Sequence, residues 1–318
     1  MSKYKYDVSI VIVCMNNLKN LYPCLKSIKM HTNTVSYETL VVAYLFSKEN
    51  LEKVRIDFPW VTFIESNEIR GFSENNNLAL WQAKGQYCFV VNDDTEMKQP
   101  VIDILCHSIK SLPKETAIIS PKILLDRTRQ ILLGKPRFTF YTFLLDNLKL
   151  SNLYLRNSPY INKQGVFQTY NISGASFLIK TDVFEKLGWF DEKYFFCPED
   201  IALSSKANEN GYKCYVNSEV EIHHYSGGTW STSIKATKPA AVKGEYYFYC
   251  SNSFLKKILF VSFLSIIFIG KMFYWLTIGH YLKTEKSYMM FEANRNAFVS
   301  LYSKKNPKEL FVEYFKHA

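Results

Sequence analysis

The first half of the chain alternates short apolar runs with segments of helical pattern, and this alternation constrains the fold more than any other feature. Runs at 8–14, 37–45 and 61–66 have the length and composition of buried strands. The intervening segments 20–31 and 48–58 are predicted to be helices. Strands joined by helices of this length form right-handed β-α-β units. We therefore expect an α/β fold with a mostly parallel sheet and helices on both faces.

A further helix and strand lead to the first candidate site residues. Residues 73–85 are predicted to form a helix capped by Ser73 and stopped by Gly85, and the apolar run after it is the next strand. Ligands of parallel sheets bind at the carboxyl ends of the strands. Residues 14–16 and 92–96 lie at two such ends, so we expect the site there.

The second half repeats this order after an irregular stretch at 125–168, which we interpret as a flexible or substrate-shaped insert. Residues 175–180 are predicted to be a strand and 181–188 a helix. A longer helix is expected at 199–211, closed by Asn-Gly, and a further strand at 213–217.

The last 75 residues are strongly apolar and aromatic. Their longest uncharged run, 258–270, has 13 residues, which is short for a membrane-spanning helix. Four lysines, with aromatic residues among them, favour a helix or helical hairpin in the bilayer interface; they are Lys256, Lys257, Lys271 and Lys283. The alternative is an ordinary buried helix with a contact to a second copy. We expect a domain at 1–235, with nucleotide-binding (1–120) and acceptor (165–235) halves, and a helical, basic, membrane-associating region at 236–318.

Charge and cysteine content narrow the class of partner and compartment. A formal net charge of +10 suits an acidic partner: nucleic acid, anionic lipid or a phosphorylated substrate. The lysines are dispersed outside the C-terminal region, so we expect no nucleic-acid binding. The seven cysteines are scattered without a Cys-x-x-Cys pair, which suits free thiols in a reducing compartment. No apolar leader segment precedes the first strand, so we expect no secretion.

The acids at the end of the strand before Asn92 are the first candidate site. Carboxylates are costly to crowd unless a cation or ligand compensates them. Asp94 is a natural ligand for Mg²⁺ or Mn²⁺, which prefer oxygen ligands and leave positions open for phosphate. Asp93, expected on the opposite side of the strand, would bind a ribose or sugar hydroxyl. The alternative is a structural acidic turn.

A second acidic pair, Glu199 and Asp200, falls in the first turn of the helix expected after Pro198. An ionised carboxylate held there can act as a general base toward an acceptor hydroxyl. Equally, both acids could serve helix stability alone.

The third candidate is the pair His223 and His224, which follows a strand and precedes the glycines at 227 and 228. One histidine could complete a metal site or contact phosphate, while the glycine turn exposes backbone N–H groups to an anion. Adjacent residues of a strand face opposite sides, so only one of the two should reach the site.

Five segments carry a resemblance: VSIVIVCMNN, RGFSENNNLAL, VNDDTEM, GASFLIKTDVFEKLGWFDEKYFFCPED and HHYSGGTW. In this order they resemble the motifs of family-2 glycosyltransferases of the GT-A fold, most of all a bacterial rhamnosyltransferase-like branch that builds surface polysaccharides. The resemblance spans about residues 7–230 and implies a Rossmann-like sheet, a nucleotide-sugar donor and a divalent metal ion.

Residue by residue, the resemblance implies Asp94 as metal ligand, Asp200 as catalytic base and Glu199 as the neighbour that orients it or binds the acceptor. It places His224, or else His223, near the metal and diphosphate. It also implies donor contacts by Cys14, Asn16, Arg70, Gly71 and Asn77.

The chain departs from the family where an acid is expected to read the nucleobase: Ala43 or Tyr44 stands there. Base recognition must therefore differ, and dTDP-, UDP- and CDP-linked sugars all remain open. A smaller departure is Ala202, where the family often has another Asp.

The function that follows is an inverting, metal-dependent transferase. It would move rhamnose or another deoxyhexose to a polyprenyl-diphosphate-linked glycan, in O-antigen or capsule synthesis. It would act in the cytoplasm at the inner face of a bacterial plasma membrane, with a homo-oligomer possible. The alternatives are a nucleotidyltransferase, which CMNNLKN disfavours because it lacks a phosphate-loop glycine, and a degenerate transferase that binds nucleotide sugar without turnover.

Overall fold

The computed structural model describes residues 3–125, 130–151, 153, 160, 162–225, 233–282 and 284–315. By its contacts the chain divides into two compact units. The sheet unit comprises Met1–Arg137, Arg156–Asp191 and Asp200–Ser226, and the helical unit comprises Phe138–Leu155, Glu192–Glu199 and Gly227–Ala318. The segments 138–155 and 192–199 therefore belong to the helical unit, whereas we expected one boundary at residue 235.

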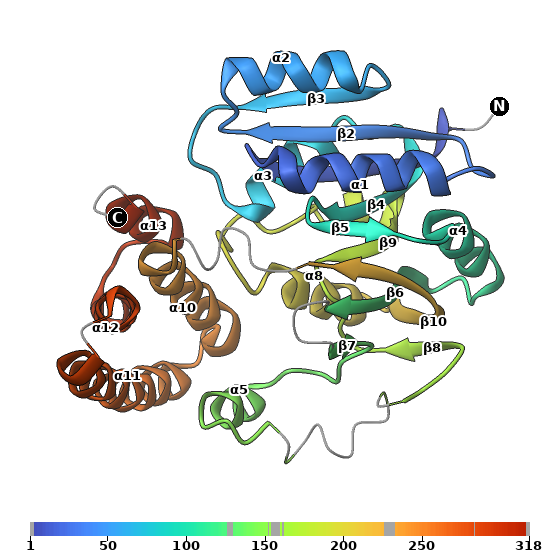
Figure 1. The fold of residues 1–318 in the computed structure, drawn as a ribbon. Coiled ribbons are helices and arrows are strands. Elements are labelled where there is room, and N and C mark those ends of the chain that lie inside the picture. Colours follow the sequence, from blue (N-terminus) through green and yellow to red (C-terminus); the bar gives the residue numbers. More distant parts are fainter. Residues whose placement is uncertain are drawn as a thin grey trace. The chain divides into compact units, whose positions relative to one another are not determined.

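The N-terminal part of the sheet unit has the predicted order of strands and helices (Figure 1). Its elements are β1 (Tyr6–Met15), α1 (Leu18–His31), β2 (Tyr37–Tyr44), α2 (Lys48–Asp57) and β3 (Val61–Ser66). β2 pairs in parallel with both β1 and β3. The expected β-α-β units are therefore confirmed.

The next helix, α3 (Phe72–Leu80), begins and ends earlier than predicted. Gly71, and not Ser73, is its N-cap, and the Glu74 carboxylate accepts a hydrogen bond from the Gly71 N–H at 2.9 Å. Gly85 does not stop the helix but opens β4 (Gly85–Asn92), which pairs in parallel with β1. A Cβ at Gly85 would lie 2.3 Å from the Ser9 nitrogen, so close packing of the two strands requires glycine there.

The rest of the sheet is mixed. It is built from β5 (Thr95–Met97), α4 (Val101–Ser111), β6 (Thr116–Leu125), β7 (Gln130–Leu132), β8 (Val166–Thr169), β9 (Ser176–Lys180), α7 (Thr181–Lys186), α8 (Glu199–Glu209) and β10 (Lys213–His224). The described strands form one sheet in the order β3-β2-β1-β4-β9-β6-β10-β5, with β7 on β6 and β8 on β10. β9 runs antiparallel to both β4 and β6, and β5 runs antiparallel to β10. The sheet is therefore mostly parallel, as predicted, with antiparallel insertions that the pattern did not reveal.

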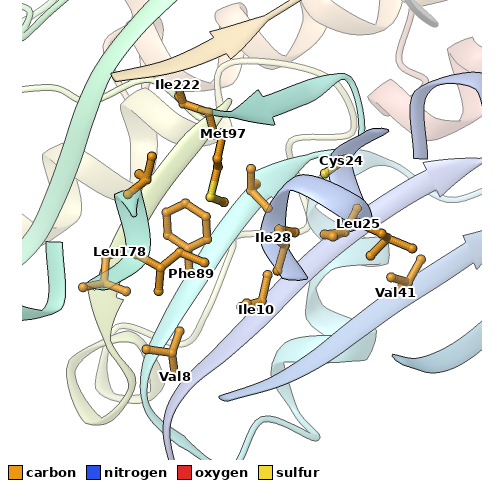
Figure 2. Close-up of a cluster of buried hydrophobic side chains, with 14 of the residues drawn as sticks. Val8, Ile10, Cys24, Leu25, Ile28, Val41, Phe89, Met97, Leu178 and Ile222 are labelled. Atoms are coloured by element: carbon orange, nitrogen blue, oxygen red, sulfur yellow. The ribbon is translucent and has the colours of Figure 1, made fainter. Parts of the chain in front are cut away.

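Apolar side chains cover both faces of this sheet. Figure 2 shows the cluster on one face, where Leu25 and Ile28 of α1 pack with Ile10 of β1 and Phe89 of β4. On the opposite face, buried residues of α3, α7 and α8 pack against alternate strand positions such as Val11. This arrangement confirms helices on both faces and leaves the carboxyl ends of β1, β2 and β4 together at one edge.

The helical unit consists of α5 (Phe140–Asn147), α10 (Ile234–Cys250), α11 (Phe254–Leu282), α12 (Glu285–Tyr302) and α13 (Pro307–Phe315). α11 and α12 form a helical hairpin, and one side of α11 buries Phe260, Leu264 and Phe268 in the core of the unit. The stretch expected to be irregular contains α5, which packs in this unit. Phe143 of α5 stacks on Phe260 of α11 with 4.9 Å between the ring centroids.

Candidate functional site

Asp93 and Asp94 lie in the turn between β4 and β5, and not within a strand. The strand alternation from which we expected them on opposite sides therefore does not apply. Residues 95–97 form β5, which the sequence analysis missed, and His224 of β10 is the register partner of Thr95. This pairing brings the end of β10 beside the turn, and the Tyr225 N–H donates to the Asp94 carbonyl at 2.9 Å.

His224 is the member of the histidine pair that contacts Asp94. Its Nε2 lies 3.0 Å from Asp94 Oδ1, and the two side chains are 15% and 12% exposed. The other ring nitrogen, Nδ1, is buried without a hydrogen-bond partner in the part of the chain that the structure describes. The glycines at 227 and 228, predicted to approach an anion, lie outside the described residues.

A carboxylate oxygen beside an imidazole nitrogen is a donor pair that fits a divalent metal ion. Imidazole suits Mn²⁺ better than Mg²⁺, which prefers oxygen ligands throughout. Among the described residues, no group of three or more His, Cys, Asp or Glu side chains converges. Asp94 and His224 would therefore supply part of the coordination shell and leave positions for diphosphate oxygens and water.

The Asp93 carboxylate lies close to Cys14, at the end of β1. The Cys14 thiol donates a hydrogen bond to the Asn17 carbonyl at 3.5 Å. Burial, followed by repulsion from Asp94, raises the pKa of Asp93 to about 7. The Cys14 side chain is fully buried, and its pKa is raised well above the usual range, first by burial and then by Asp93. The Cys14 side chain is therefore buried beside Asp93, and its predicted contact with the donor stays a prediction.

Asn16 follows β1 in a left-handed conformation, with φ of 49°. Its side-chain oxygen accepts hydrogen bonds from the Ser47 N–H at 3.2 Å and from Asn50 Nδ2 at 2.9 Å. Ser47 is also the N-cap of α2. These bonds tie the loop after β1 to the start of α2. Asn16 itself is exposed at the carboxyl end of β1, where the site is expected.

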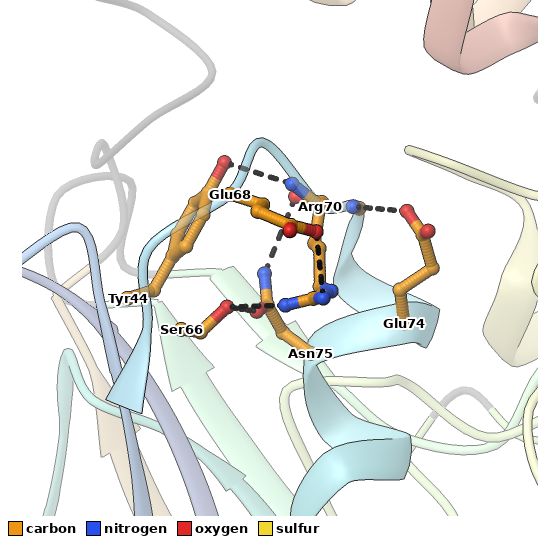
Figure 3. Close-up of polar contacts among 7 residues, drawn as sticks. Tyr44, Ser66, Glu68, Arg70, Glu74 and Asn75 are labelled. Atoms are coloured by element: carbon orange, nitrogen blue, oxygen red, sulfur yellow. Dashed lines mark hydrogen bonds and ion pairs between the residues drawn. The ribbon is translucent and has the colours of Figure 1, made fainter. Parts of the chain in front are cut away.

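Tyr44 and Arg70 lie in one polar network at the ends of β2 and β3 (Figure 3). The hydroxyl of the nearly buried Tyr44 accepts a hydrogen bond from the Arg70 N–H at 3.3 Å. The Arg70 guanidinium pairs with Glu68 at 2.8 Å and donates to Ser66 Oγ at 3.4 Å. Asn75 closes the network by donating to the Arg70 carbonyl at 3.2 Å.

This network clarifies the departure seen in the sequence. A tyrosine hydroxyl stands where an acid was expected, and it fixes the backbone of Arg70, which precedes the helix cap Gly71. Arg70 and Gly71 thus lie in the segment that joins the end of β3 to α3, and their predicted contact with the donor stays a prediction. Glu68 and Ser66 were missed, because no local pattern in the sequence marks a network that depends on tertiary contact.

Asn77 of α3 is buried inside the sheet unit. It is 2% exposed, and its side chain donates to the Phe190 carbonyl at 3.0 Å and accepts from the Phe190 N–H at 3.2 Å. These reciprocal bonds tie α3 to the loop after α7. Both functional atoms of this amide therefore hold the fold together, and the predicted donor contact of Asn77 stays a prediction.

Asp200 lies in the first turn of α8, as predicted, and it belongs to the sheet unit. Its Oδ2 accepts from the Gly174 N–H at 2.9 Å, and its Oδ1 accepts from the Ile201 N–H at 2.7 Å. A Cβ at Gly174 would lie 3.2 Å from the Asp200 Cβ, so glycine there permits this close approach. Each carboxylate oxygen is held by one N–H and keeps a lone pair for a proton.

Glu199 belongs to the helical unit, where its carboxylate accepts a hydrogen bond from the Cys197 N–H at 2.7 Å. The two acids of the pair are thus anchored by different segments. Only Asp200 is anchored to the loop that precedes β9.

Comparisons with known proteins agree with this fold. The family model described as "Glycosyl transferase family 2" matches residues 9–188, more than half of the chain. O-antigen biosynthesis protein RfbC of Myxococcus xanthus is 23% identical over 219 residues, which cover 67% of this chain and 16% of that protein. The matched region is therefore a small part of the relative.

Solved structures show the same fold at low identity. Mannosyltransferase PcManGT from Pyrobaculum calidifontis, in complex with GDP-Man and Mn²⁺, has a TM-score of 0.55 at 15% identity, over 95% of this chain and 89% of its own. TarS 1–349 of S. aureus, in complex with UDP-GlcNAc, has a TM-score of 0.52 at 17% identity, over 93% and 82%. GalNAc-T7 with UDP, GalNAc and Mn²⁺ has a TM-score of 0.54 at 18% identity, over 72% of this chain and 46% of its own.

Proposed function

The chain belongs to glycosyl transferase family 2 and is a nucleotide-sugar-dependent glycosyltransferase, and we propose that it inverts the anomeric carbon as it transfers a sugar to a lipid-linked glycan. One observation carries this proposal above the others. The Asp94 carboxylate and the His224 imidazole lie 3.0 Å apart at strand ends, where ligands of such sheets bind.

Asp94 and His224 are the residues that would hold a divalent metal ion, Mn²⁺ before Mg²⁺. When bound, the ion supplies charge neutralisation for the leaving diphosphate. Asp93, in the same turn as Asp94, would accept a hydrogen bond from a ribose or sugar hydroxyl.

Asp200 is the proposed general base. The acceptor oxygen attacks the anomeric carbon, the bond from that carbon to the diphosphate oxygen breaks, and the hydroxyl proton passes to the Asp200 carboxylate. The nucleoside diphosphate leaves with the electron pair of the broken bond. Glu199 orients the acceptor beside this base.

The donor is proposed to be a dTDP-, UDP- or CDP-linked rhamnose or other deoxyhexose. Arg70 and Gly71 would line the nucleotide side of the site, with Asn16 at its edge. Tyr44 takes the place of the usual base-reading acid and would hold this loop in shape. PcManGT and TarS were solved with GDP-Man and UDP-GlcNAc, so the fold accepts more than one nucleotide, and the donor needs a direct test.

The acceptor is proposed to be a polyprenyl-diphosphate-linked glycan of O-antigen or capsule synthesis, as the similarity to RfbC suggests. Phe254–Gly279 of α11 is long and apolar enough to cross a membrane, and 22% of its most apolar window is buried. α11 carries no Asp or Glu. Because its other side packs in the helical unit, we propose that it lies on the inner face of a bacterial plasma membrane as a peripheral, cytoplasmic anchor.

A donor panel tests the proposal. Binding and hydrolysis of UDP-, dTDP-, GDP- and CDP-linked sugars would be measured with Mn²⁺, with Mg²⁺ and with chelator. We expect one donor to bind only with metal and Asp94→Asn to lose that binding. The matched control is Asp182→Asn, an exposed acid of α7 in the same unit that pairs with Lys186.

Other outcomes identify other functions. Metal-dependent donor binding without transfer to any lipid-linked glycan would indicate a degenerate transferase. Formation of a nucleotide sugar from a sugar phosphate and a nucleoside triphosphate would indicate a nucleotidyltransferase. Failure of every donor to bind would contradict the proposal as a whole.

A further inference from the structure

Tyr225 follows the last residue of β10 and contacts β5 and the turn before it at two points. Its backbone N–H donates to the Asp94 carbonyl at 2.9 Å, and its hydroxyl donates to Glu96 Oε2 at 2.5 Å. The residue between these two acids, Thr95, is the register partner of His224. One tyrosine therefore joins the end of β10 to the residues on both sides of the last pair of the ladder.

β5 is an edge strand that a short pairing holds to its neighbour. It stands at the end of the strand order, and it pairs with β10 over three residues. Segments with few pairing bonds open locally at a lower free energy than the core of a sheet. A side-chain bond across this pairing therefore matters more here than it would between the long strands β1 and β2.

Other bonds fix β5 to the rest of the sheet unit. The Met97 N–H donates to Ser27 Oγ of α1 at 3.1 Å, and Thr95 Oγ1 donates to the Asn92 carbonyl at 2.8 Å. These bonds hold β5 to α1 and close the turn after β4, whereas the Tyr225 hydroxyl joins β5 to the end of β10. Losing that hydroxyl should therefore loosen the end of β10 and leave the turn in place.

The two donors of the proposed metal site lie on the two sides of this pairing. Asp94 belongs to the turn before β5 and His224 is the last residue of β10, with 3.0 Å between Oδ1 and Nε2. One ion can bind both groups only while this separation is kept. Residues that fix the ligands of a metal ion without touching it typically contribute 10- to 100-fold to its affinity.

We propose that Tyr225 is a positioning residue of the metal site. Its hydroxyl bond to Glu96 keeps the end of β10 closed on β5, and this closure holds the Asp94 carboxylate and the His224 imidazole where both can bind one divalent ion. The inference rests on the proposed function for the presence of that ion. Neither Tyr225 nor Glu96 has to touch the ion or the donor.

The alternative is a bond that serves stability alone, and the sheet unit offers a matched case of that kind. The Tyr22 hydroxyl of α1 donates to the Asp57 carboxylate of α2. Tyr22→Phe therefore removes the same type of bond from another place in the same unit. It is the control for Tyr225→Phe, and thermal melts show that both variants are folded.

Binding of Mn²⁺ to the full chain, without donor, tests the inference through the EPR signal of the free ion. We expect Tyr225→Phe and Glu96→Ala each to weaken Mn²⁺ binding about tenfold, and Tyr22→Phe to leave it unchanged. Glu96→Gln keeps an acceptor oxygen for the tyrosine hydroxyl, so it should retain most of the affinity. The double variant Tyr225→Phe/Glu96→Ala should bind Mn²⁺ no more weakly than either single variant, because both changes break the same bond.

Hydrogen exchange of the residue 225 amide reports on the pairing without any metal. This N–H donates to the Asp94 carbonyl, so it exchanges when the end of β10 opens. We expect about tenfold faster exchange in Tyr225→Phe, the effect of one hydrogen bond to a carboxylate, with the amides of β1 unchanged. In turnover, the Mn²⁺ concentration for half-maximal rate should rise while kcat at saturating Mn²⁺ stays within about twofold.

Unchanged Mn²⁺ affinity in folded Tyr225→Phe would overturn the inference and leave the proposed function intact. An equal loss of affinity in Tyr22→Phe would also overturn it. Glu96→Gln as damaging as Glu96→Ala would make the effect one of charge and not of the bond. If wild type binds neither Mn²⁺ nor Mg²⁺ and Asp94→Asn changes nothing, the metal of the proposed function fails and this inference fails with it.

Discussion

Replacing Asp200 by asparagine separates its role as a base from its role in the fold. The change removes the ability to take a proton while preserving the shape of the side chain. General-base catalysis is typically worth about 10²- to 10⁴-fold, so we expect kcat to fall by that factor. Donor KM should stay within about twofold, because Asp200 is proposed to act on the acceptor and not on the donor.

The structure also predicts a cost to stability. Both carboxylate oxygens accept backbone N–H groups, from Gly174 and Ile201. An asparagine has one acceptor oxygen, so in either orientation its NH₂ group faces one of these donors. Leaving one donor unsatisfied costs about 1–3 kcal/mol. Urea unfolding should detect this loss, and kinetics must be measured where the variant is fully folded.

Glu199→Gln is the matched control from the same helical turn. The glutamine oxygen can still accept from the Cys197 N–H, so we expect little change in stability. If Glu199 only orients the acceptor, its kcat should fall less than about tenfold. The reasoning is refuted if folded Asp200→Asn keeps kcat within tenfold of wild type, or if Glu199→Gln is the more damaging change.

Three further predictions concern other parts of the sheet unit and the thiols. Asn77→Leu leaves the buried N–H and carbonyl of Phe190 unpaired, so it should destabilise the protein by about 2–4 kcal/mol in urea unfolding. Donor affinity should be unchanged in the folded protein. A loss of donor affinity without loss of stability would instead support the predicted donor contact. Tyr44→Phe removes the acceptor for the Arg70 N–H and should weaken donor binding by about threefold to tenfold in calorimetry, and unchanged affinity would show that this loop does not contact the nucleotide. A thiol-reactive dye should label Cys197 rapidly in the native protein and the other six cysteines only on unfolding, because Cys197 alone is exposed; rapid labelling of a second thiol would contradict this packing.

Local pattern sufficed for the N-terminal strands β1 to β4, but it did not predict β6, which pairs in parallel with β10. The Val and Ile run over 8–14 predicted β1 to within a few residues, because a strand buried on both faces gives a continuous apolar run. Residues 61–66 predicted the edge strand β3 with the bounds that the structure shows. The direction of β9 could not be predicted, because an antiparallel strand between β4 and β6 differs from a parallel one only in its pairing. α3 began earlier than expected because the Glu74 carboxylate accepts the Gly71 N–H, so that Gly71 and not the serine is the N-cap.

The candidate site shows the same division between local chemistry and long-range pairing. The sequence placed Asp94 and His224 near each other only through resemblance, and it left the choice between His223 and His224 open. That choice is made by the register of β5 on β10: His224 is opposite Thr95, so the next residue toward the turn, Asp94, meets its imidazole. β5 is three residues long and carries no distinctive pattern, which is why it was missed. A one-residue slip of β10 would turn His224 to the other face and bring His223 into its place. The geometry of the proposed metal site therefore depends on a pairing of only three residues, and changes that weaken β5 should affect metal affinity before they affect global stability.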